Sequence, residues 1–389
     1  MRISRFRTIG ISALQGAILP FSGLITASLG IYLFGIESWG KFVFIQLTIF
    51  PITLVCNWGS RNFLIKELSL DPAKIGKTFL TNLASRAFLL PLSLTLFILL
   101  PFKTAALSVL IIIVQFFYLS YDGPTVFTES FIKRISAEIL GLVCFVIGLT
   151  FISEFDVNLI LAVQSGVLII KSIYLSIALK GLQLFKAKPS FKLGYTLKFG
   201  FPFFAIGLSG WLQSKSDLYM LTILEGSRDI AAYQIVIGGL SVIQAVIGFL
   251  IEPLIKFVYR SKEGVIKGIG AFVFKIGVPI IILGLVTLAL ILEWLAPNRF
   301  DVYTYLFGLL YLIPFLIFMP SIFKLYKANK ERRVVYVSVF SAGVNLLLTW
   351  LFIPTLGLNG ALLGSALSQI VMLILFRLLV KSTHSKAYD

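Results

Sequence analysis

Five charged residues fall deep inside long apolar runs, where a charge is costly. Arg86, Lys171, Lys215 and Lys275 are basic, and Asp217 is acidic. A Lys, Arg or Asp at the centre of a bilayer costs roughly 2.5–3.5 kcal/mol on insertion scales, so it usually faces a cavity or a partner. An excess of buried cations indicates a nearby anion, and cationic side chains bind phosphate groups through charge-assisted hydrogen bonds. The four bases therefore predict a cationic cavity that binds an anionic substrate.

Lys215 and Asp217 lie in a stretch of five consecutive polar residues, Gln213 to Asp217. Positions two apart on a helix differ by about 200°, so these two charges point to nearly opposite faces and cannot pair closely. Either one side chain faces a cavity and the other a neighbouring helix, or the helix is locally unwound, as broken helices at transport sites are. Asp217 is predicted to bind a coupling ion, H⁺ or Na⁺, or to form a structural ion pair with a base on another helix.

Neutral polar residues also occur within the apolar runs. Gln46, Gln213 and Asn345 are candidates for hydrogen bonds to a polar substrate. The alternative for each is an ordinary hydrogen bond between neighbouring membrane helices.

The elements that would position these residues are twelve apolar runs, each near the length of about 20 residues that a helix needs to cross a bilayer. With 58% hydrophobic residues in a chain of 389, the sequence predicts an all-α polytopic membrane protein. The predicted spans are 11–33, 40–60, 78–100, 104–121, 135–152, 157–180, 197–225, 229–251, 268–292, 301–323, 333–354 and 358–380.

The basic residues supply an independent indication of topology. Most of the 34 Lys and Arg residues fall in alternate gaps: 1–10, 59–77, 121–135, 180–198, 251–268, 324–333 and the tail from Arg377. By the positive-inside rule these gaps are cytoplasmic, and so are both termini. The net charge of +17 then reflects orientation and contact with anionic lipid rather than nucleic acid. Glu138, at the cytoplasmic end of its span, is predicted to be a surface anchor.

Several features argue against an enzyme. The sequence has no nucleotide-binding glycine motif and no HExxH motif, and its single histidine, His384, lies in the polar tail. His-based acid–base chemistry and multi-His metal sites are therefore not expected. Cys56 and Cys144 both fall within spans, with no disulfide or metal spacing. We expect no catalytic residues, no metal site and no cofactor other than the coupling ion.

The chain divides around the basic 180–198 segment into two sets of six spans. The predicted domains are an N-terminal six-helix bundle, 1–185, and a C-terminal six-helix bundle, 186–389. The hairpin at 33–44 is similar to the one at 223–234, each with an acid, a glycine and an aromatic residue that opens the next helix. Such duplicated, pseudo-symmetric halves are common in secondary transporters, with the substrate path between them.

Four stretches carry a resemblance to a known family. They are Gly35–Phe42, Asn57–Leu68, Asp217–Gly226 with Ala232-Tyr233, and Asn345–Ala361. Their order and spacing resemble the Wzx-type polysaccharide flippases, which translocate O-antigen or capsule repeat units, of the MATE-like multidrug/oligosaccharidyl-lipid/polysaccharide exporter superfamily. The sequence departs from the family pattern at Asn57, where an aspartate is more usual and would supply a carboxylate that asparagine lacks.

This resemblance implies a function. Such proteins pass an undecaprenyl-diphosphate-linked oligosaccharide from the inner to the outer leaflet of the bacterial cytoplasmic membrane, alternating between inward- and outward-open states. The resemblance implies that the diphosphate is the anion bound by the four bases, and that the sugars contact Gln46, Gln213 and Asn345. It also implies a polysaccharide polymerase and a chain-length regulator as partners in lipopolysaccharide or capsule synthesis, and no nucleic acid.

Three alternatives remain. A MATE-like exporter of small cationic drugs predicts an acidic cavity, whereas these spans are rich in bases. A polytopic enzyme of polysaccharide assembly usually has a large outward loop or a cluster of acids on one face, and the sequence has neither. A non-transporting scaffold would not need buried bases.

Overall fold

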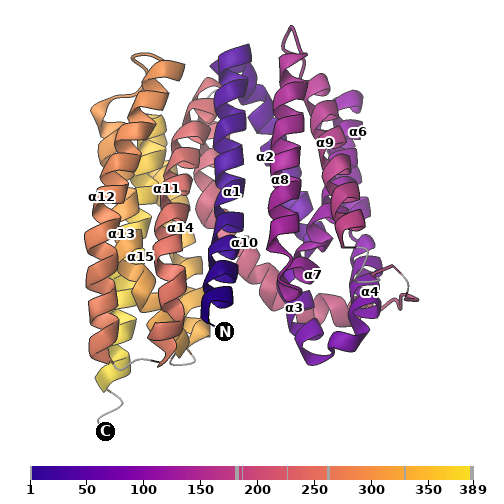
Figure 1. The fold of residues 1–389 in the computed structure, drawn as a ribbon. Helices are drawn as coiled ribbons and strands as arrows, with labels where there is room; N and C mark the ends of the chain where they lie inside the picture. Colours follow the sequence, from indigo (N-terminus) through magenta and orange to yellow (C-terminus); the bar gives the residue numbers. More distant parts are fainter. Residues whose placement is uncertain are drawn as a thin grey trace. The chain divides into compact units, whose positions relative to one another are not determined.

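We describe the protein from a computed structural model. It describes residues 2–179, 184–185, 187–225, 227–260, 263–327 and 330–385, and every regular element in these ranges is helical (Figure 1). The helices of the first half are α1 (Arg2–Phe34), α2 (Ile36–Asn57), α3 (Ser60–Leu70), α4 (Ile75–Ala87), α5 (Leu96–Leu99), α6 (Phe102–Ser120), α7 (Asp122–Phe127), α8 (Phe131–Thr150) and α9 (Val157–Ala178). Those of the second half are α10 (Leu193–Leu224), α11 (Ser227–Arg260), α12 (Glu263–Leu295), α13 (Val302–Lys327), α14 (Glu331–Leu356) and α15 (Leu358–Ser385).

The described residues contain nine helical segments that are long and apolar enough to cross a membrane. The other three predicted spans fall in α1, α8 and α10. Helix α8 carries three charged residues near its start, Lys133, Arg134 and Glu138, which distinguish it from the nine apolar segments. The multi-pass membrane character predicted from the sequence is confirmed, whereas the number of twelve spans stays a prediction.

The structure shows whether two of the predicted spans, 78–100 and 197–225, are continuous helices. The run 78–100 is not one continuous helix: α4 ends at Ala87, a 3₁₀ segment covers Leu90–Thr95, and α5 follows. Pro91 explains the interruption, because proline lacks the N–H that the α-helical ladder requires. Local unwinding at Gln213–Asp217, one of the two alternatives left open by the sequence, is not seen, since the described backbone of α10 is helical throughout Leu193–Leu224.

The chain forms two compact units. The first unit is Leu33–Leu208, and the second unit combines Met1–Tyr32 with Ser209–Asp389. In the first unit α9 packs against α6 and α8, and α2 packs against α6. In the second unit α15 packs against α13 and α14, while α11, α12 and α13 contact one another. Tyr32 of α1 stacks on Trp294 of α12 at 5.4 Å within the second unit, and the predicted 1–185 and 186–389 bundles stay a prediction.

The turn between α2 and α3, at Trp58 and Gly59, fixes the position of the carboxyl end of α2. Trp58 and Gly59 both have left-handed backbone angles, with φ of 42° and 66°. The Trp58 indole stacks on Phe204 at 4.3 Å, and its Nε1 donates to the Leu197 carbonyl at 2.9 Å. A Cβ on Gly59 would lie 2.6 Å from the Phe204 nitrogen, so only glycine fits. The carboxyl end of α2 is thereby held against the first half of α10.

Candidate functional site

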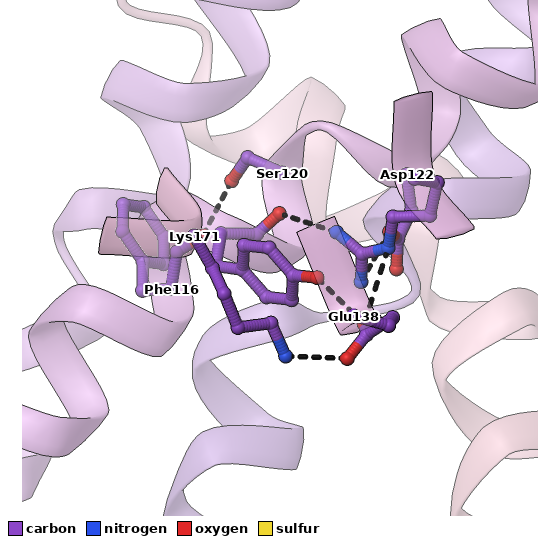
Figure 2. A network of polar contacts seen from close by, with 7 residues as sticks. Phe116, Ser120, Asp122, Glu138 and Lys171 are labelled. Atoms are coloured by element: carbon purple, nitrogen blue, oxygen red, sulfur yellow. Dashed lines mark hydrogen bonds and ion pairs between the residues drawn. The ribbon is translucent and has the colours of Figure 1, made fainter. Parts of the chain in front are cut away.

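A network of buried charges occupies the first unit, with Glu138 at its centre (Figure 2). The Glu138 carboxylate accepts hydrogen bonds from Lys171 Nζ at 2.5 Å and from the Tyr118 hydroxyl at 2.6 Å. Arg134 Nε lies 3.5 Å from the same carboxylate, and Arg134 Nη2 lies 2.9 Å from Asp122 Oδ1. Two acids thus face two bases, and the network carries no net charge.

Four helices supply this network. Tyr118 is at the end of α6, Asp122 begins α7, Arg134 and Glu138 lie one turn apart on α8, and Lys171 is on α9. The tyrosine ring also contacts both cations, with Arg134 Cζ 3.8 Å and Lys171 Nζ 4.3 Å from its centroid, distances typical of cation–π interactions.

The surroundings of Lys171 and Glu138 differ from the expectations drawn from the sequence. Glu138 is only 4% exposed, so the prediction that it is a surface anchor was wrong. Its burial has a physical cause: Gly141, one turn further along α8, leaves space for the Lys171 side chain, whose stem a Cβ there would meet. Lys171 therefore has a carboxylate partner from the protein itself, and its predicted role in substrate binding stays a prediction.

Arg86 is fully buried in the first unit and bonds to neutral groups. Its Nε donates to Asn82 Oδ1 at 2.8 Å and its Nη2 to Ser120 Oγ at 2.7 Å. Its Nη1 donates to the carbonyls of Cys56 and Asn57, at 3.3 and 3.2 Å, and to Asn57 Oδ1 at 3.3 Å.

These contacts explain how the charge of Arg86 is accommodated. Cys56 and Asn57 are the last two residues of α2, and the carboxyl end of a helix carries a partial negative charge and unsatisfied carbonyls. The guanidinium supplies donors to those carbonyls. Asn57, where the resembling family more often has aspartate, still accepts a hydrogen bond, but without a carboxylate charge. The helix end thus provides the stabilisation that the sequence analysis assigned to a bound anion, and the predicted substrate-binding role of Arg86 stays a prediction.

Asp217 is the centre of a second cluster, in the second unit. Its carboxylate accepts hydrogen bonds from the Tyr233 hydroxyl, from Ser365 Oγ at 3.0 Å and from the Leu218 backbone nitrogen at 2.9 Å. Asn345 joins the cluster because its Oδ1 lies 3.2 Å from Ser365 Oγ. Among the described residues, Asp217 makes no ion pair, so the structural ion pair that the sequence left open is not seen here.

Further side-chain oxygen atoms lie around Asn345, beside the Asp217 carboxylate. Asn345 Nδ2 donates to Ser216 Oγ at 3.1 Å, and Thr349 Oγ1 lies 3.2 Å from Asn345 Oδ1. Ser365 has a single hydroxyl proton to share between the Asp217 and Asn345 oxygens. Side chains from α10, α11, α14 and α15 therefore converge as an oxygen-rich cluster, which we call the Asp217 cluster: Ser216, Asp217, Tyr233, Asn345, Thr349 and Ser365.

The remaining predicted residues are dispersed. Lys215 is half-buried and makes no ion pair within the described part of the chain, and in particular none with Asp217, as its helical spacing predicts. Lys275 is exposed. Gln46 exchanges hydrogen bonds with Gln164 of α9 at 2.7 and 3.1 Å, the interhelical alternative. The side chain of Gln213 lies outside the described residues.

The sequence analysis did not single out Tyr118, Asp122, Arg134, Tyr233 or Ser365 as site residues. Tyr233 was part of a quoted motif, but its partner lies 16 positions away on another helix. Asp122 and Arg134 lie in the 121–135 segment, which the sequence predicts to be a cytoplasmic connection rather than part of a site. Only the packing of helices shows these contacts.

Comparison with known proteins connects this fold to transporters. The structure matches that of lipid II flippase MurJ in an inward closed conformation, with a TM-score of 0.71 and 13% identity over 93% of this chain and 85% of the other. It also matches an inward-facing multidrug resistance MATE family transporter, with a TM-score of 0.67 and 14% identity over 96% of this chain and 95% of the other. A eukaryotic MATE transporter matches with a TM-score of 0.61 and 12% identity over 97% and 96% of the two chains.

No protein-family model matches the sequence, and neither does any curated protein. At such low identity the structural matches establish the fold alone. The chain has the all-helical polytopic membrane fold that is shared by MurJ and the MATE transporters.

Proposed function

We propose that this protein is a flippase that moves an undecaprenyl-diphosphate-linked oligosaccharide from the inner to the outer leaflet of the bacterial cytoplasmic membrane by alternating access. The observation that carries the proposal is the fold match to a lipid II flippase over 93% of the chain. The resemblance of the sequence motifs to Wzx-type flippases supports a sugar-bearing lipid as the cargo. In this proposal both termini are cytoplasmic, and a polysaccharide polymerase and a chain-length regulator act on the product.

Lys215 is the strongest candidate for the diphosphate ligand. Of the four predicted bases, Lys171 has Glu138 as partner and Arg86 caps α2, whereas Lys215 has no ion pair within the described residues. A Lys ammonium that is partly withdrawn from water and forms no close ion pair within the described residues is suited to bind a mobile anion. Lys275 is exposed and is the second candidate.

The Asp217 cluster is the candidate site for the coupling ion. A carboxylate surrounded by hydroxyl and amide oxygens suits a proton or a hard cation such as Na⁺. Outward movement of an anionic diphosphate is already favoured by a membrane potential that is negative inside, by about 2.3 kcal/mol per charge per 100 mV. A cation moving inward on Asp217 would add to this and return the carrier.

The test is a flipping assay with purified protein in proteoliposomes that contain a fluorescent undecaprenyl-diphosphate oligosaccharide. We expect protein-dependent exchange of the lipid between leaflets, about tenfold slower in Lys215→Ala, the effect of losing a hydrogen bond to a charged group. Lys103→Ala, an exposed lysine at the start of α6, is the matched control and should exchange normally. Exchange no faster than in protein-free liposomes would refute the proposal.

A MATE-like exporter of small molecules is the second candidate function. It is favoured by the match to a multidrug resistance MATE transporter, which spans 96% of this chain and 95% of the other. The same proteoliposomes distinguish the two, because an exporter would move a small cationic dye in response to an ion gradient and leave the lipid-linked oligosaccharide in place.

A further inference from the structure

Helices α14 and α15 share a polar face that extends beyond the Asp217 cluster. On α14, Ser341, Asn345 and Thr349 are four residues apart, and so lie on one face of the helix. On α15, Ser365 and Gln369 are likewise four apart. All five side chains are buried.

The register of the two antiparallel helices places Ser341 and Gln369 opposite each other. A Cβ on Gly364 would lie 2.8 Å from the Thr349 nitrogen, and the Ser365 hydroxyl lies 3.2 Å from Asn345 Oδ1. One further turn towards the start of α14 leads from Asn345 to Ser341, and the same turn of α15 leads from Ser365 to Gln369. Each step is about 6 Å along the helix axis.

Both residues carry a buried polar atom without a partner. Ser341 is 0% and Gln369 6% exposed, and among the described residues neither Ser341 Oγ nor Gln369 Oε1 has a hydrogen-bond partner. Leaving such a group unpaired costs roughly 1–3 kcal/mol, a cost that a purely structural contact would not need. By contrast Ser368, on the same helix, bonds the Ser365 carbonyl at 2.8 Å.

Beyond this pair the same face becomes apolar. A hydrophobic cluster, which we call the plug, begins one to two turns further along each helix. Val334 and Val337 of α14 and Met372 and Phe376 of α15 pack there with Phe318 and Leu325 of α13. It lies between the polar pair and the ends of α14 and α15 that are predicted to be cytoplasmic. From the Asp217 cluster towards the predicted cytoplasmic ends, the face therefore carries first the two unpaired polar atoms and then the apolar plug.

We propose that the face shared by α14 and α15 is the inner half of the route of the coupling cation, in which Ser341 and Gln369 solvate the ion between the Asp217 cluster and the cytoplasmic side. This inference depends on the proposed ion coupling. The polar pair replaces water around the ion at the point where the ion has left the carboxylate, and the plug closes the route in the conformation described. Opening the plug would hydrate the pair.

The first experiment measures hydration without requiring transport. In a variant with Cys56 and Cys144 replaced by serine, Ser341→Cys should react with a small water-soluble methanethiosulfonate reagent applied from the cytoplasmic side, and faster when Phe376→Ala weakens the plug. Ser108→Cys is the matched control, since Ser108 is also fully buried with an unpaired hydroxyl but lies on α6. Equal reactivity at positions 341 and 108, with or without the plug variant, would overturn the proposal.

The second experiment measures coupling. Ser341→Ala and Gln369→Met should each slow gradient-driven lipid exchange about tenfold, under a pH gradient if the ion is H⁺ or a sodium gradient if it is Na⁺. Ser368→Ala should not. Unchanged gradient-driven rates in both variants would overturn the route, whereas a wild-type protein that responds to neither gradient would refute the proposed coupling itself.

Discussion

Glu138 in α8 and Asp217 in α10 are both buried carboxylates on long apolar helices, but their partners are of different kinds. Glu138 contacts two cations and a tyrosine hydroxyl, and a second acid balances the second cation. Asp217 contacts two hydroxyls and a backbone N–H, and no cation among the described residues. A neutralised carboxylate is a fixed structural link between helices. A carboxylate that contacts only neutral donors retains the capacity to bind a cation. By this difference Glu138 is a structural residue and Asp217 a candidate ion-binding residue.

The largest expected effect is the loss of the Glu138 carboxylate. Glu138→Ala leaves Lys171 and Arg134 buried with one acid between them, and breaking a buried ion pair by removing one partner costs about 3–5 kcal/mol. We expect little protein in the membrane and a strongly lowered unfolding midpoint in detergent. Partial recovery in the double variant Glu138→Ala/Lys171→Met would identify the unpaired ammonium as the cause. Normal accumulation of the single variant would contradict a structural role for the network.

Arg86→Ala is expected to have a smaller effect on stability. It removes hydrogen bonds but leaves only neutral acceptors, namely the α2 carbonyls, Asn82 and Ser120, so the loss should be about 1–3 kcal/mol. Arg86→Lys should recover part of it, because an ammonium can still cap the helix end. The measurement is the unfolding midpoint beside that of Lys215→Ala, which should be unchanged. If Arg86→Ala kept full stability but lost lipid exchange, the substrate-binding role predicted from the sequence would be supported instead.

The buried charged residues show which features of this protein can be predicted from its sequence and which cannot. Hydropathy and the alternation of basic gaps predicted a multi-pass helical protein, because both depend on composition along the chain. The two-residue spacing also separated Lys215 from Asp217 correctly. The sequence could not pair Glu138 with Lys171, which are 33 positions apart and meet only because α8 packs on α9. The sequence also could not predict the partners of Arg86, because two of them are backbone carbonyls at the end of α2, and every residue type has a backbone carbonyl.

Asp217→Asn tests whether Asp217, unlike Glu138, binds a coupling ion rather than holding helices together. The substitution keeps the size of the side chain and an oxygen that can accept from Tyr233 or Ser365, so we expect a change in unfolding free energy of no more than about 1 kcal/mol. Lipid exchange should lose its dependence on the ion gradient while some gradient-independent exchange remains. A variant that is poorly folded would instead place Asp217 with Glu138 as a structural acid. A variant with unchanged gradient dependence would remove Asp217 as the coupling site.

The smallest effect is expected at the ion pair between Asp71 and Lys74, which isolates burial as the variable. Its Nζ–Oδ2 distance is 2.5 Å, the same as the Nζ–Oε2 distance of the Lys171–Glu138 pair. The side chains of Lys74 and Asp71 are 64% and 44% exposed, whereas those of Lys171 and Glu138 are 11% and 4% exposed. The hydrogen bond from Lys74 lowers the pKa of Asp71, so the pair contributes stability above the usual aspartate pKa and loses it as the pH falls through the lowered value. Water and salt screen such an exposed pair, and Asp71→Asn should leave the unfolding midpoint at neutral pH unchanged. If Asp71→Asn destabilised the protein as much as Glu138→Ala, contact distance rather than burial would set the strength of these ion pairs, and the contrast drawn between Glu138 and Asp217 would lose its physical basis.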